Sequence, residues 1–380
     1  MRPPALSPGE GSTGQDRTHL RVEGTDPRRR GHDRGRRTGA EIVRAWGTYS
    51  QLFETAATAA GVKLDVPALA LGTLSATRAW APELAAEMEG VAEGAGVPLW
   101  VVAALNARTE ILAVTATPRS SECSTAVHLG THSAGGRTVG GQTWDWHVEL
   151  AGTWHIQSVR GDTLGFTGIT EYGILGKIGV NEAGVGVLFN ILGHVDDGAG
   201  GVPVHLVARR VLGSAASFED AVAILSDAPV SASTVMTIVT EGRAASVELS
   251  PAGAVTVHPD GEGWLLHTNH FIDPVPAAGE LRGRLEPETH DRLRVLSARA
   301  HERHGLDGPG DLADLLNVHQ DGGAEVCCHA PPTGRLGTRW ATLATVAVDP
   351  AARRLHVHDG GPCSATPSTW TSLTPHGTKD

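Results

Sequence analysis

Hydrophobic residues follow two different spacings along the chain, and the change between them falls near residue 120. Between Glu41 and Leu112 the apolar residues recur every three or four positions, as they do on the buried face of a helix. Pro98 suits the start of a helix over 99–112. The spacing predicts a helical segment of about three helices over 39–122, whose buried faces include Ile42, Trp46, Tyr49, Phe53, Trp80, Leu84, Met88 and Val91.

After Cys123 the pattern becomes that of short strands interrupted by a few helices. Alternating or β-branched runs are bounded by glycine, as is typical of strands joined by tight turns. Strands are predicted at Thr153–Arg160, Leu164–Thr170, Gly184–Phe189, Thr234–Thr240, Ala245–Leu249, Gly253–Val257, Trp264–Thr268, Ala341–Val348 and Arg353–His358. Helices are predicted at Val204–Leu212, Ser217–Leu225 and Thr289–His304, the second with Ser217 and Asp220 as a capping box.

This order of elements predicts an α+β fold. Neighbouring strands joined by short turns pair antiparallel, and helices cover the sheets that they form. No linker divides the part after Cys123, so we expect 39–122 and 123–380 to form one structural domain. Residues 1–38 show no apolar period and are rich in arginine, which predicts a disordered head.

Composition and charge exclude several classes of protein. The net charge is −11, and residues 1–40 are near +4, so the rest is an acidic body that does not favour nucleic acid. No run of 18 apolar residues occurs, and we expect no membrane span. Four scattered cysteines and no secretory signal predict a reducing cytoplasm, where Cys123 stays a free thiol.

Cys123 is the candidate nucleophile. It opens a stretch of small residues, and a Gly-rich turn with Asp145 between two tryptophans follows 22 positions later. A cysteine at the start of its own chain can use its α-amino group, with a pKa near 7.7–8.0, as the base that activates the thiol. This interpretation requires prior cleavage between Glu122 and Cys123. The alternative is a buried structural cysteine, the usual role of a single Cys.

The residues around Cys123 resemble a known family. The most specific segments are Cys123-Ser124-Thr125, Gly141-Gln142-Thr143-Trp144-Asp145-Trp146 and Thr268-Asn269-His270-Phe271. In this order and spacing, over roughly residues 41–365, the chain resembles the peptidase C45 family, the penicillin acyltransferase-like members of the N-terminal-nucleophile hydrolase superfamily.

The resemblance implies a four-layer αββα sandwich and self-cleavage into a short and a long chain that stay associated. Carried over by motif, Cys123 is the nucleophile, Asp145 holds the new N-terminus and Asn269 stabilises the oxyanion. Arg339 is the candidate for an arginine near the last strands, with Arg335 competing. Taken alone, Asp145 and Asn269 are equally compatible with turn residues, and Arg339 with a surface salt bridge.

Two departures from the family pattern concern the cleavage site and its surroundings. Glu122 stands where the family's best-known member has glycine, and Thr143 stands where that enzyme has asparagine. Glycine relaxes strain at a scissile bond, so Glu122 bears on the speed of cleavage. We expect Thr143, Trp144 and Trp146 beside the substrate, with one tryptophan lining an acyl pocket.

The predicted function is acyl transfer through an acyl-Cys123 intermediate, with small N-acyl amides or thioesters as substrates and no cofactor. Hydrolysis is favoured over transfer, and an acyl-CoA-dependent N-acyltransferase is the alternative. Cys327-Cys328-His329 lacks the usual zinc spacing, and adjacent cysteines ligate one metal poorly, so we expect no metal site. Two further alternatives are a metal-dependent hydrolase built on the histidine-rich loops and an uncleaved binding protein.

Overall fold

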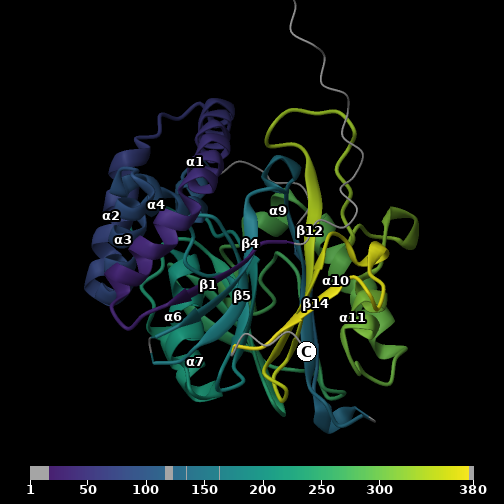
Figure 1. Ribbon diagram of the computed structural model, residues 1–380. Coiled ribbons are helices and arrows are strands. Elements are labelled where there is room, and N and C mark those ends of the chain that lie inside the picture. The colour runs from purple at the N-terminus through teal and green to yellow at the C-terminus, as the bar shows by residue number, and fades with distance from the viewer. Residues whose placement is uncertain (1–16, 116–122, 134, 162, 376–380) are drawn as a thin grey trace, which may run out of the picture.

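The N-terminal helices form a bundle at one side of the molecule (Figure 1). The computed structural model describes residues 17–115, 123–133, 135–161 and 163–375. Strand β1 (His19–Glu23) precedes five helices where about three were predicted, because Pro82 and the break at Ala107 divide the apolar pattern. The helices are α1 (Pro27–Ala60), α2 (Val66–Trp80), α3 (Pro82–Ala95), α4 (Leu99–Asn106) and α5 (Arg108–Ala113).

The predicted disorder of residues 1–38 is wrong for 17–38, which form β1 and the first turns of α1; residues 1–16 lie outside the described part of the chain. These turns pack through glycine instead of large apolar side chains. A Cβ atom on Gly35 would lie 2.2 Å from the carbonyl oxygen of Val91 in α3, and one on Gly90 would lie 2.0 Å from that of Arg28. The two helix backbones therefore touch, which a search for apolar periodicity does not detect.

A buried cluster of charges holds the same two helices together. Arg30 and Arg34 of α1 reach the carboxylate of Glu87 in α3 at 2.8 and 3.4 Å. Arg209 joins them from α6 at 3.1 Å. All four side chains are at most 2% exposed. Arg30 and Arg34, which belong to the segment predicted to be disordered, are thus part of the interior.

Two sheets lie face to face behind the bundle. The first has eight strands in the order β1-β4-β5-β6-β7-β8-β9-β10, antiparallel except for β1, which pairs parallel with β4. Their bounds are β4 (Trp154–Arg160), β5 (Phe166–Glu171), β6 (Ile178–Asn181), β7 (Gly186–Ile191), β8 (Thr234–Thr240), β9 (Arg243–Ser250) and β10 (Gly253–Val257).

The second sheet has six antiparallel strands in the order β11-β2-β3-β12-β13-β14. The predicted Gly-rich turn over 141–146 is wrong, because these residues belong to the long central strand β3. Gly141 accommodates the neighbouring helix α11, since a Cβ there would lie 2.2 Å from Leu312. The bounds are β2 (Thr125–His128), β3 (Val139–His147), β11 (Trp264–His267), β12 (Trp340–Asp349), β13 (Arg354–Asp359) and β14 (Trp370–Leu373).

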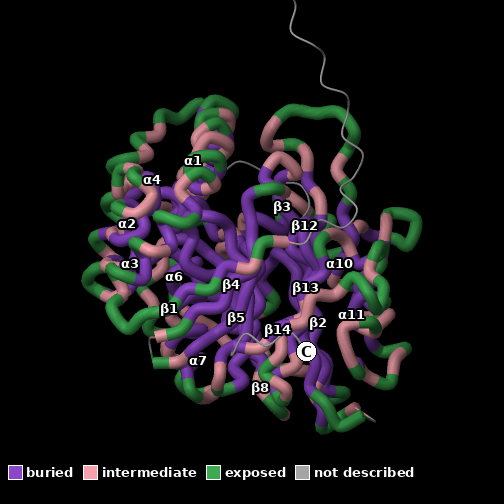
Figure 2. The backbone as a smooth tube through the Cα atoms, viewed as in Figure 1, coloured by how far each residue is buried: buried purple, intermediate pink, exposed green. Residues whose placement is uncertain are grey.

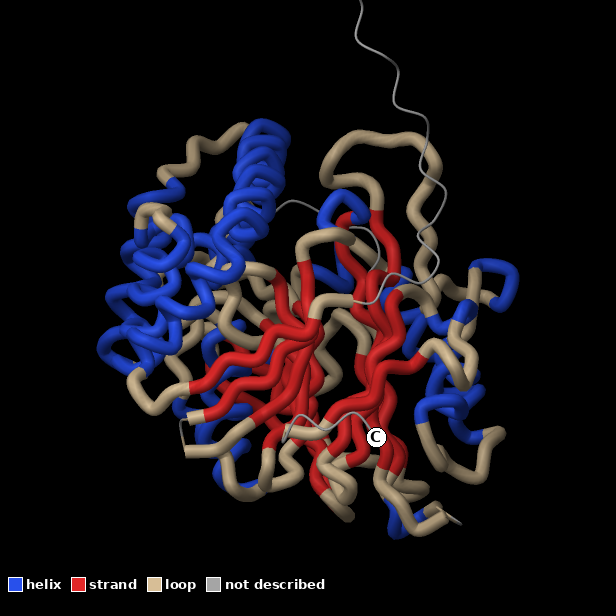
Figure 3. Tube along the Cα trace, viewed as in Figure 1, coloured by secondary structure: helices blue, strands red, loops and turns tan. Residues whose placement is uncertain are grey.

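Helices cover the outer face of each sheet, which confirms the predicted αββα order. Helices α6 (Val204–Ser214) and α7 (Phe218–Asp227) pack on the eight-stranded sheet, and α10 (Glu288–His301) and α11 (Pro309–Leu316) pack on the six-stranded sheet. Short helices α8 (Pro274–Ala277) and α9 (Arg282–Leu285) precede α10. The central strands of the two sheets are almost wholly buried, as the tube coloured by burial and the tube coloured by secondary structure show (Figures 2 and 3).

Among the described residues, no helix combines the length and the apolar character needed to cross a membrane.

Candidate active site

Cys123 lies directly before β2, between the two sheets. Strand β2 pairs with β3 on one side and β11 on the other, so the residues that flank Cys123 are held by both neighbours. Ser124 and Thr143 exchange two hydrogen bonds, from Ser124 N to Thr143 Oγ1 at 3.1 Å and from Thr143 N to Ser124 O at 3.0 Å. Cys123 is 6% exposed, so its position is fixed inside the sandwich.

Two side chains hold the carbonyl oxygen of Cys123. Asn190 of β7 donates to it from Nδ2 at 2.9 Å, and Arg292 of α10 donates from Nη1 at 3.1 Å. The same Arg292 donates to Ser124 Oγ at 3.0 Å and to Asn269 Oδ1 at 3.0 Å. Arg292 therefore connects Cys123 to Asn269. It also orients the Asn269 side-chain amide, because its guanidinium binds Oδ1 and leaves Nδ2 on the other side.

Asp145 is buried on β3 with one oxygen satisfied. Its Oδ1 accepts from the Thr342 hydroxyl at 2.7 Å, whereas its Oδ2 has no hydrogen-bond partner in the structure. Burial raises the pKa of Asp145 to about 7, against the lowering effects of the Thr342 hydroxyl and Arg292. A buried carboxylate oxygen without a partner is costly, and it is suited to receive a cationic group.

The thiol of Cys123 is protonated at neutral pH. Burial raises its pKa to about 11 and Asp145 adds to the rise, while Lys177, the Asp145 backbone N–H and Arg292 oppose it. Lys177 is itself poorly solvated, and burial lowers its pKa to about 7 although Glu171 favours its charge. The thiol therefore needs a further base before it can attack a carbonyl group.

A small cavity adjoins the thiol. We call it the inner cavity; its side chains leave only a narrow space, and it is lined by Arg108, Cys123, Trp144, Asp145, Trp146, Lys177, Phe189 and Ile191. Lys177 Nζ lies 3.9 Å from the centre of the Trp144 ring, and the Arg108 guanidinium lies 4.1 Å from that of Trp146. The predicted tryptophans therefore form part of its wall.

A charged network supports this wall from behind. Glu171 accepts from Arg108 at 2.9 Å and from Lys177 at 3.2 Å, and Tyr49 also donates to it. The Trp146 indole N–H donates to the Tyr49 hydroxyl at 2.8 Å. The network fixes Trp146 and keeps two cations beside the inner cavity.

A larger pocket lies next to the inner cavity, and Ile191 lines both. It holds about 620 Å³ of empty space between α5, the segment after β7 and helix α9. Apolar residues such as Leu112 and Leu192 line it together with Arg282 and Glu286, which form an ion pair at 3.0 Å. The site therefore combines a narrow end, lined by aromatic side chains together with Lys177, Arg108 and Asp145, with a wider end that carries the Arg282–Glu286 pair.

The structure brings together most of the residues predicted from the motifs. Cys123, Thr143, Trp144, Asp145 and Trp146 surround the inner cavity or contact its lining, and Asn269 joins them through Arg292. Glu122 lies outside the described residues.

Arg339 is not at this site. It pairs with Glu149 at 3.2 Å and is 28% exposed, as the surface salt-bridge alternative expected. The competing Arg335 is also exposed. The arginine at the site is Arg292, which is 5% exposed.

Sequence reasoning missed Arg292, Asn190 and Lys177. Arg292 lies on the predicted helix over 289–304 among several other arginines, and no local motif marks it. Asn190 directly follows the predicted strand Gly184–Phe189, and its local sequence does not mark it as a site residue. Burial of an arginine and a lysine beside Cys123 is set by the packing of distant elements, so only the tertiary structure identifies them.

Three comparisons relate the chain to known proteins. Among solved structures, a Caenorhabditis elegans N-acylethanolamine-hydrolyzing acid amidase ortholog is 15% identical with a TM-score of 0.42, covering 60% of this chain and 93% of its own. Penicillin V acylase from Agrobacterium tumefaciens is 16% identical with a TM-score of 0.43, covering 66% and 86%.

Similarity in sequence is more extensive. The chain is 28% identical over 284 residues to the 40 kDa form of acyl-coenzyme A:6-aminopenicillanic-acid-acyltransferase from Emericella nidulans, covering 74% of this chain and 76% of the relative. Residues 133–362 match the family model described as acyl-coenzyme A:6-aminopenicillanic acid acyl-transferase. Because this match spans more than half of the chain, the chain belongs to that family of acyl-transfer enzymes, as its motifs predicted.

Proposed function

We propose that the thiol of Cys123 is the nucleophile of an acyl-transfer reaction and that the chain activates it by cleaving itself between Glu122 and Cys123. One observation carries this proposal: the buried, protonated thiol of Cys123 lies beside Asp145, whose Oδ2 has no hydrogen-bond partner among the described residues. A free α-amino group on Cys123 would supply both missing parts. As an amine, with a pKa near 7.7–8.0, it is a base for the thiol, and as an ammonium it is a partner for the carboxylate.

In the proposed reaction the Cys123 thiolate attacks the carbonyl carbon of an amide or thioester. The proton taken from the thiol by the α-amine passes to the leaving group as the carbon–nitrogen or carbon–sulfur bond breaks. This leaves an acyl-thioester on Cys123. Water or an amine then attacks the thioester, and the thiol regains its proton as the acyl product leaves.

Asn269 is the proposed donor to the oxyanion of the tetrahedral intermediate. Arg292 binds its Oδ1, and Nδ2 donates to the carbonyl oxygen of Ile191 at 2.8 Å, so the amide is held at both ends. A fixed neutral donor in a site closed to water contributes roughly 3–4 kcal/mol to the transition state. The Asp145 backbone N–H, which favours the thiolate, is the candidate for positioning the sulfur.

The two pockets support a small N-acyl amide as the substrate. The inner cavity is nearly closed beside the thiol, and Trp144, Trp146 and Phe189 in its wall offer apolar contacts to an acyl group. The larger pocket, which shares Ile191 with it, fits the amine part and offers Arg282 and Glu286 for polar contacts. We favour hydrolysis because water is always available, and transfer to an amine, as the name of the fungal relative describes for that protein, shares the same first step.

N-terminal sequencing and intact mass of the purified protein test the activation step. The expected result is loss of the 39.5 kDa species and a long chain that begins with Cys123. Cys123→Ala should leave one intact chain, whereas Cys123→Ser should retain slow cleavage because its hydroxyl can still attack. Catalysis by a chain that remains joined at Glu122–Cys123 would rule the mechanism out.

The products test the reaction class. Incubation with a panel of N-acyl amides, with and without an added amine acceptor, should release free acid and amine in the wild type and neither in Cys123→Ala. Mass spectrometry of a rapidly quenched reaction should show the acyl group on the long chain at Cys123. Binding of the amides without any turnover, by a folded protein that stays joined at Glu122–Cys123, would instead support the uncleaved binding protein.

A further inference from the structure

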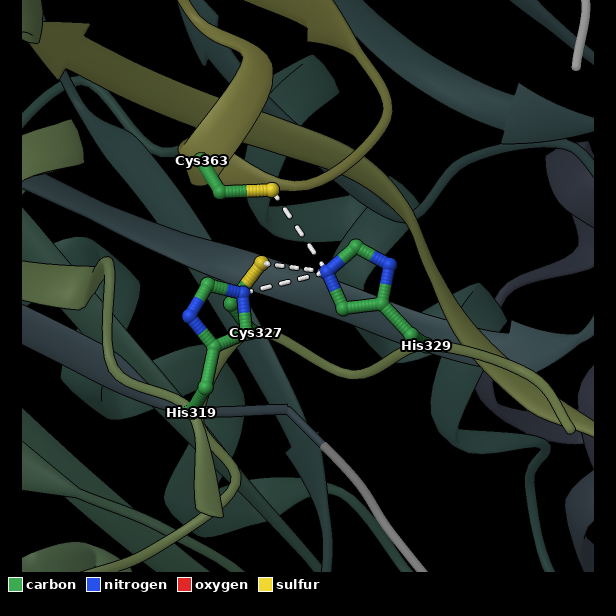
Figure 4. A group of neighbouring side chains, drawn as sticks. All are labelled: His319, Cys327, His329 and Cys363. Carbon is green, nitrogen blue, oxygen red and sulfur yellow. Dashed lines mark hydrogen bonds between the residues drawn. The ribbon is translucent and has the colours of Figure 1, made fainter. Parts of the chain in front are cut away.

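Four potential metal ligands meet in a cluster outside the lining of the inner cavity. They are His319, Cys327, His329 and Cys363, and their ligand atoms all lie within 4.8 Å of one another (Figure 4). His329 Nε2 lies 3.1 Å from His319 Nε2, 3.6 Å from Cys327 Sγ and 3.5 Å from Cys363 Sγ. All four side chains point toward one centre from three separate segments of the chain.

These distances agree with a tetrahedral metal site. Zinc binds cysteine sulfur at about 2.3 Å and histidine nitrogen at about 2.05 Å, which places two nitrogens ~3.3 Å apart and a nitrogen and a sulfur ~3.6 Å apart in a tetrahedron. The three separations from His329 follow this order within about 0.3 Å, the tolerance expected of a metal-free arrangement.

The local fold explains why these residues meet. The backbone N–H groups of Val326 and Cys327 both donate to the carbonyl oxygen of Val318, which closes a loop that brings His319 beside Cys327. The turn at Pro362–Ser364 after β13 lies over that loop, and a Cβ on Gly361 would be 2.7 Å from Cys327 Sγ. The absence of a side chain at Gly361 therefore allows Cys363 to approach.

The adjacent Cys328 takes no part. Its Sγ donates to the carbonyl oxygen of Trp340 at 3.4 Å, on the side of β12. The objection that neighbouring cysteines ligate one metal poorly therefore does not apply, because the second thiol comes from Cys363, far along the chain. The described cysteines are all free thiols.

We propose that His319, Cys327, His329 and Cys363 bind one zinc ion as a structural site. Two thiolates and two imidazoles in a tetrahedron are a typical zinc ligand set, and four protein ligands leave no position for substrate or water. Three ligands are at least partly exposed, so the ion can enter from solvent.

The proposed site is coupled to the region of Asp145 through the backbone. Cys328 N donates to Thr342 Oγ1 at 2.9 Å, Thr342 N donates to Cys328 O at 2.9 Å, and Thr342 Oγ1 donates to Asp145 Oδ1 at 2.7 Å. Zinc would therefore hold the loop before β12 against the strand residue that positions Asp145. Its role is to stabilise this arrangement and not to take part in the reaction.

Metal analysis of the full-length protein, purified without chelators and re-equilibrated with zinc, tests the proposal. The expected content is about one zinc per chain in the wild type and less than about 0.2 in Cys363→Ser, which changes an exposed ligand and leaves the core intact. Cys328→Ser is the matched control, since it changes the neighbouring thiol that faces away, and it should retain about one zinc.

Two further measurements do not depend on activity. Cobalt in place of zinc should give the visible absorption of a tetrahedral ion and the near-ultraviolet band of a thiolate–cobalt bond, and Cys363→Ser should weaken both. Removal of zinc should lower the melting temperature of the wild type but not that of Cys363→Ser. A zinc-free wild type, a Cys327–Cys363 disulfide in the freshly purified protein, or full zinc content in Cys363→Ser would each overturn the proposal.

Discussion

At the scale of single residues, Arg292 shows how one buried cation organises the site. It donates to Cys123 O, Ser124 Oγ and Asn269 Oδ1, so three groups from the segment before β2 and the loop after β11 depend on one side chain from α10. Burial lowers the pKa of Arg292, but an arginine remains charged at neutral pH. Its charge also favours ionisation of the Cys123 thiol.

Replacing Arg292 should therefore impair catalysis much more than replacing Arg339. We expect Arg292→Lys to lower kcat by about 10- to 100-fold, because lysine cannot reproduce the divergent hydrogen bonds that hold Asn269. Arg339→Lys should change kcat by less than about twofold, since its salt bridge is partly exposed. Steady-state kinetics on a cleavable amide measure both, with thermal unfolding as the check that Arg292→Lys is folded; equal losses in the two variants would contradict this assignment.

The motifs predicted some residues of the site and not others, for a physical reason. Thr143 and Asp145 lie on β3, which pairs with β2, and Cys123 lies just before β2. The pairing of these two strands therefore brings the three residues close together. Arg292 and Asn190 reach Cys123 from a helix and from the opposite sheet. Those contacts depend on how whole layers stack, which no local pattern contains.

At the scale of elements, the contact between α1 and α3 depends on glycine. Gly35→Ala should destabilise the protein, because the new Cβ would lie 2.2 Å from the Val91 carbonyl oxygen and the helices would have to separate. We expect a loss of about 2–4 kcal/mol in the free energy of unfolding. Denaturant titration measures it.

Gly47→Ala in the same helix is the matched control. A Cβ at Gly47 meets nothing within 4 Å, so alanine should stabilise α1 by up to about 1 kcal/mol. If both substitutions had the same effect, close backbone contact would not be what positions α1.

Glu87 provides the pH dependence of this region. The arginines around it outweigh burial and lower its pKa to about 2 in the folded state, from an ordinary value near 4.5. Because the pKa of Glu87 is lower in the folded than in the unfolded chain, its ionised form stabilises the fold at pH values above the unfolded pKa. This stabilisation is lost as the pH falls through the folded pKa, and the shift corresponds to about 3 kcal/mol.

Glu87→Gln should therefore lower the free energy of unfolding by about 3–5 kcal/mol near pH 7, because it removes the carboxylate that all three buried arginines contact. The difference from the wild type should narrow between about pH 4.5 and pH 2. Unfolding titrations of both proteins across this range measure it, and a difference that stays constant would contradict the prediction.

Strands were predicted correctly where short turns separate them. They were missed where strand formation depends on pairing at a sheet edge, or where a glycine suggested a turn. The runs at 234–240 and 253–257 become β8 and β10 with the predicted bounds. β1 was missed because His19–Glu23 is polar and gains its strand conformation from pairing with β4. The segment 141–146, which begins with Gly141, is instead part of β3, and Gly141 gives room to Leu312 of α11.

At the scale of the whole molecule, the segments before and after residue 123 interpenetrate. β1 pairs with β4, Arg34 donates to Gln157 at 2.7 Å and Arg108 pairs with Glu171. Glu110 accepts from Val204 N at 2.8 Å. These contacts would survive a break before Cys123, because none of them uses the bond that is cut.

We therefore expect the short and long chains to remain one particle after cleavage. Gel filtration of the processed protein under native conditions should give a single peak that contains both chains, and only a denaturant should separate them. Recovery of the long chain alone in an active, folded form would contradict this prediction.

The position of β1 also bears on any shortened version of the gene. A polypeptide begun at residue 39, where arginine-rich composition suggests that the useful part starts, would lack the outermost strand and two of the three arginines that face Glu87. The outer edge of β4 would then expose unpaired backbone N–H and C=O groups, which can pair with strands of other molecules. Trimming a stretch that looks dispensable would produce aggregates instead of a smaller enzyme.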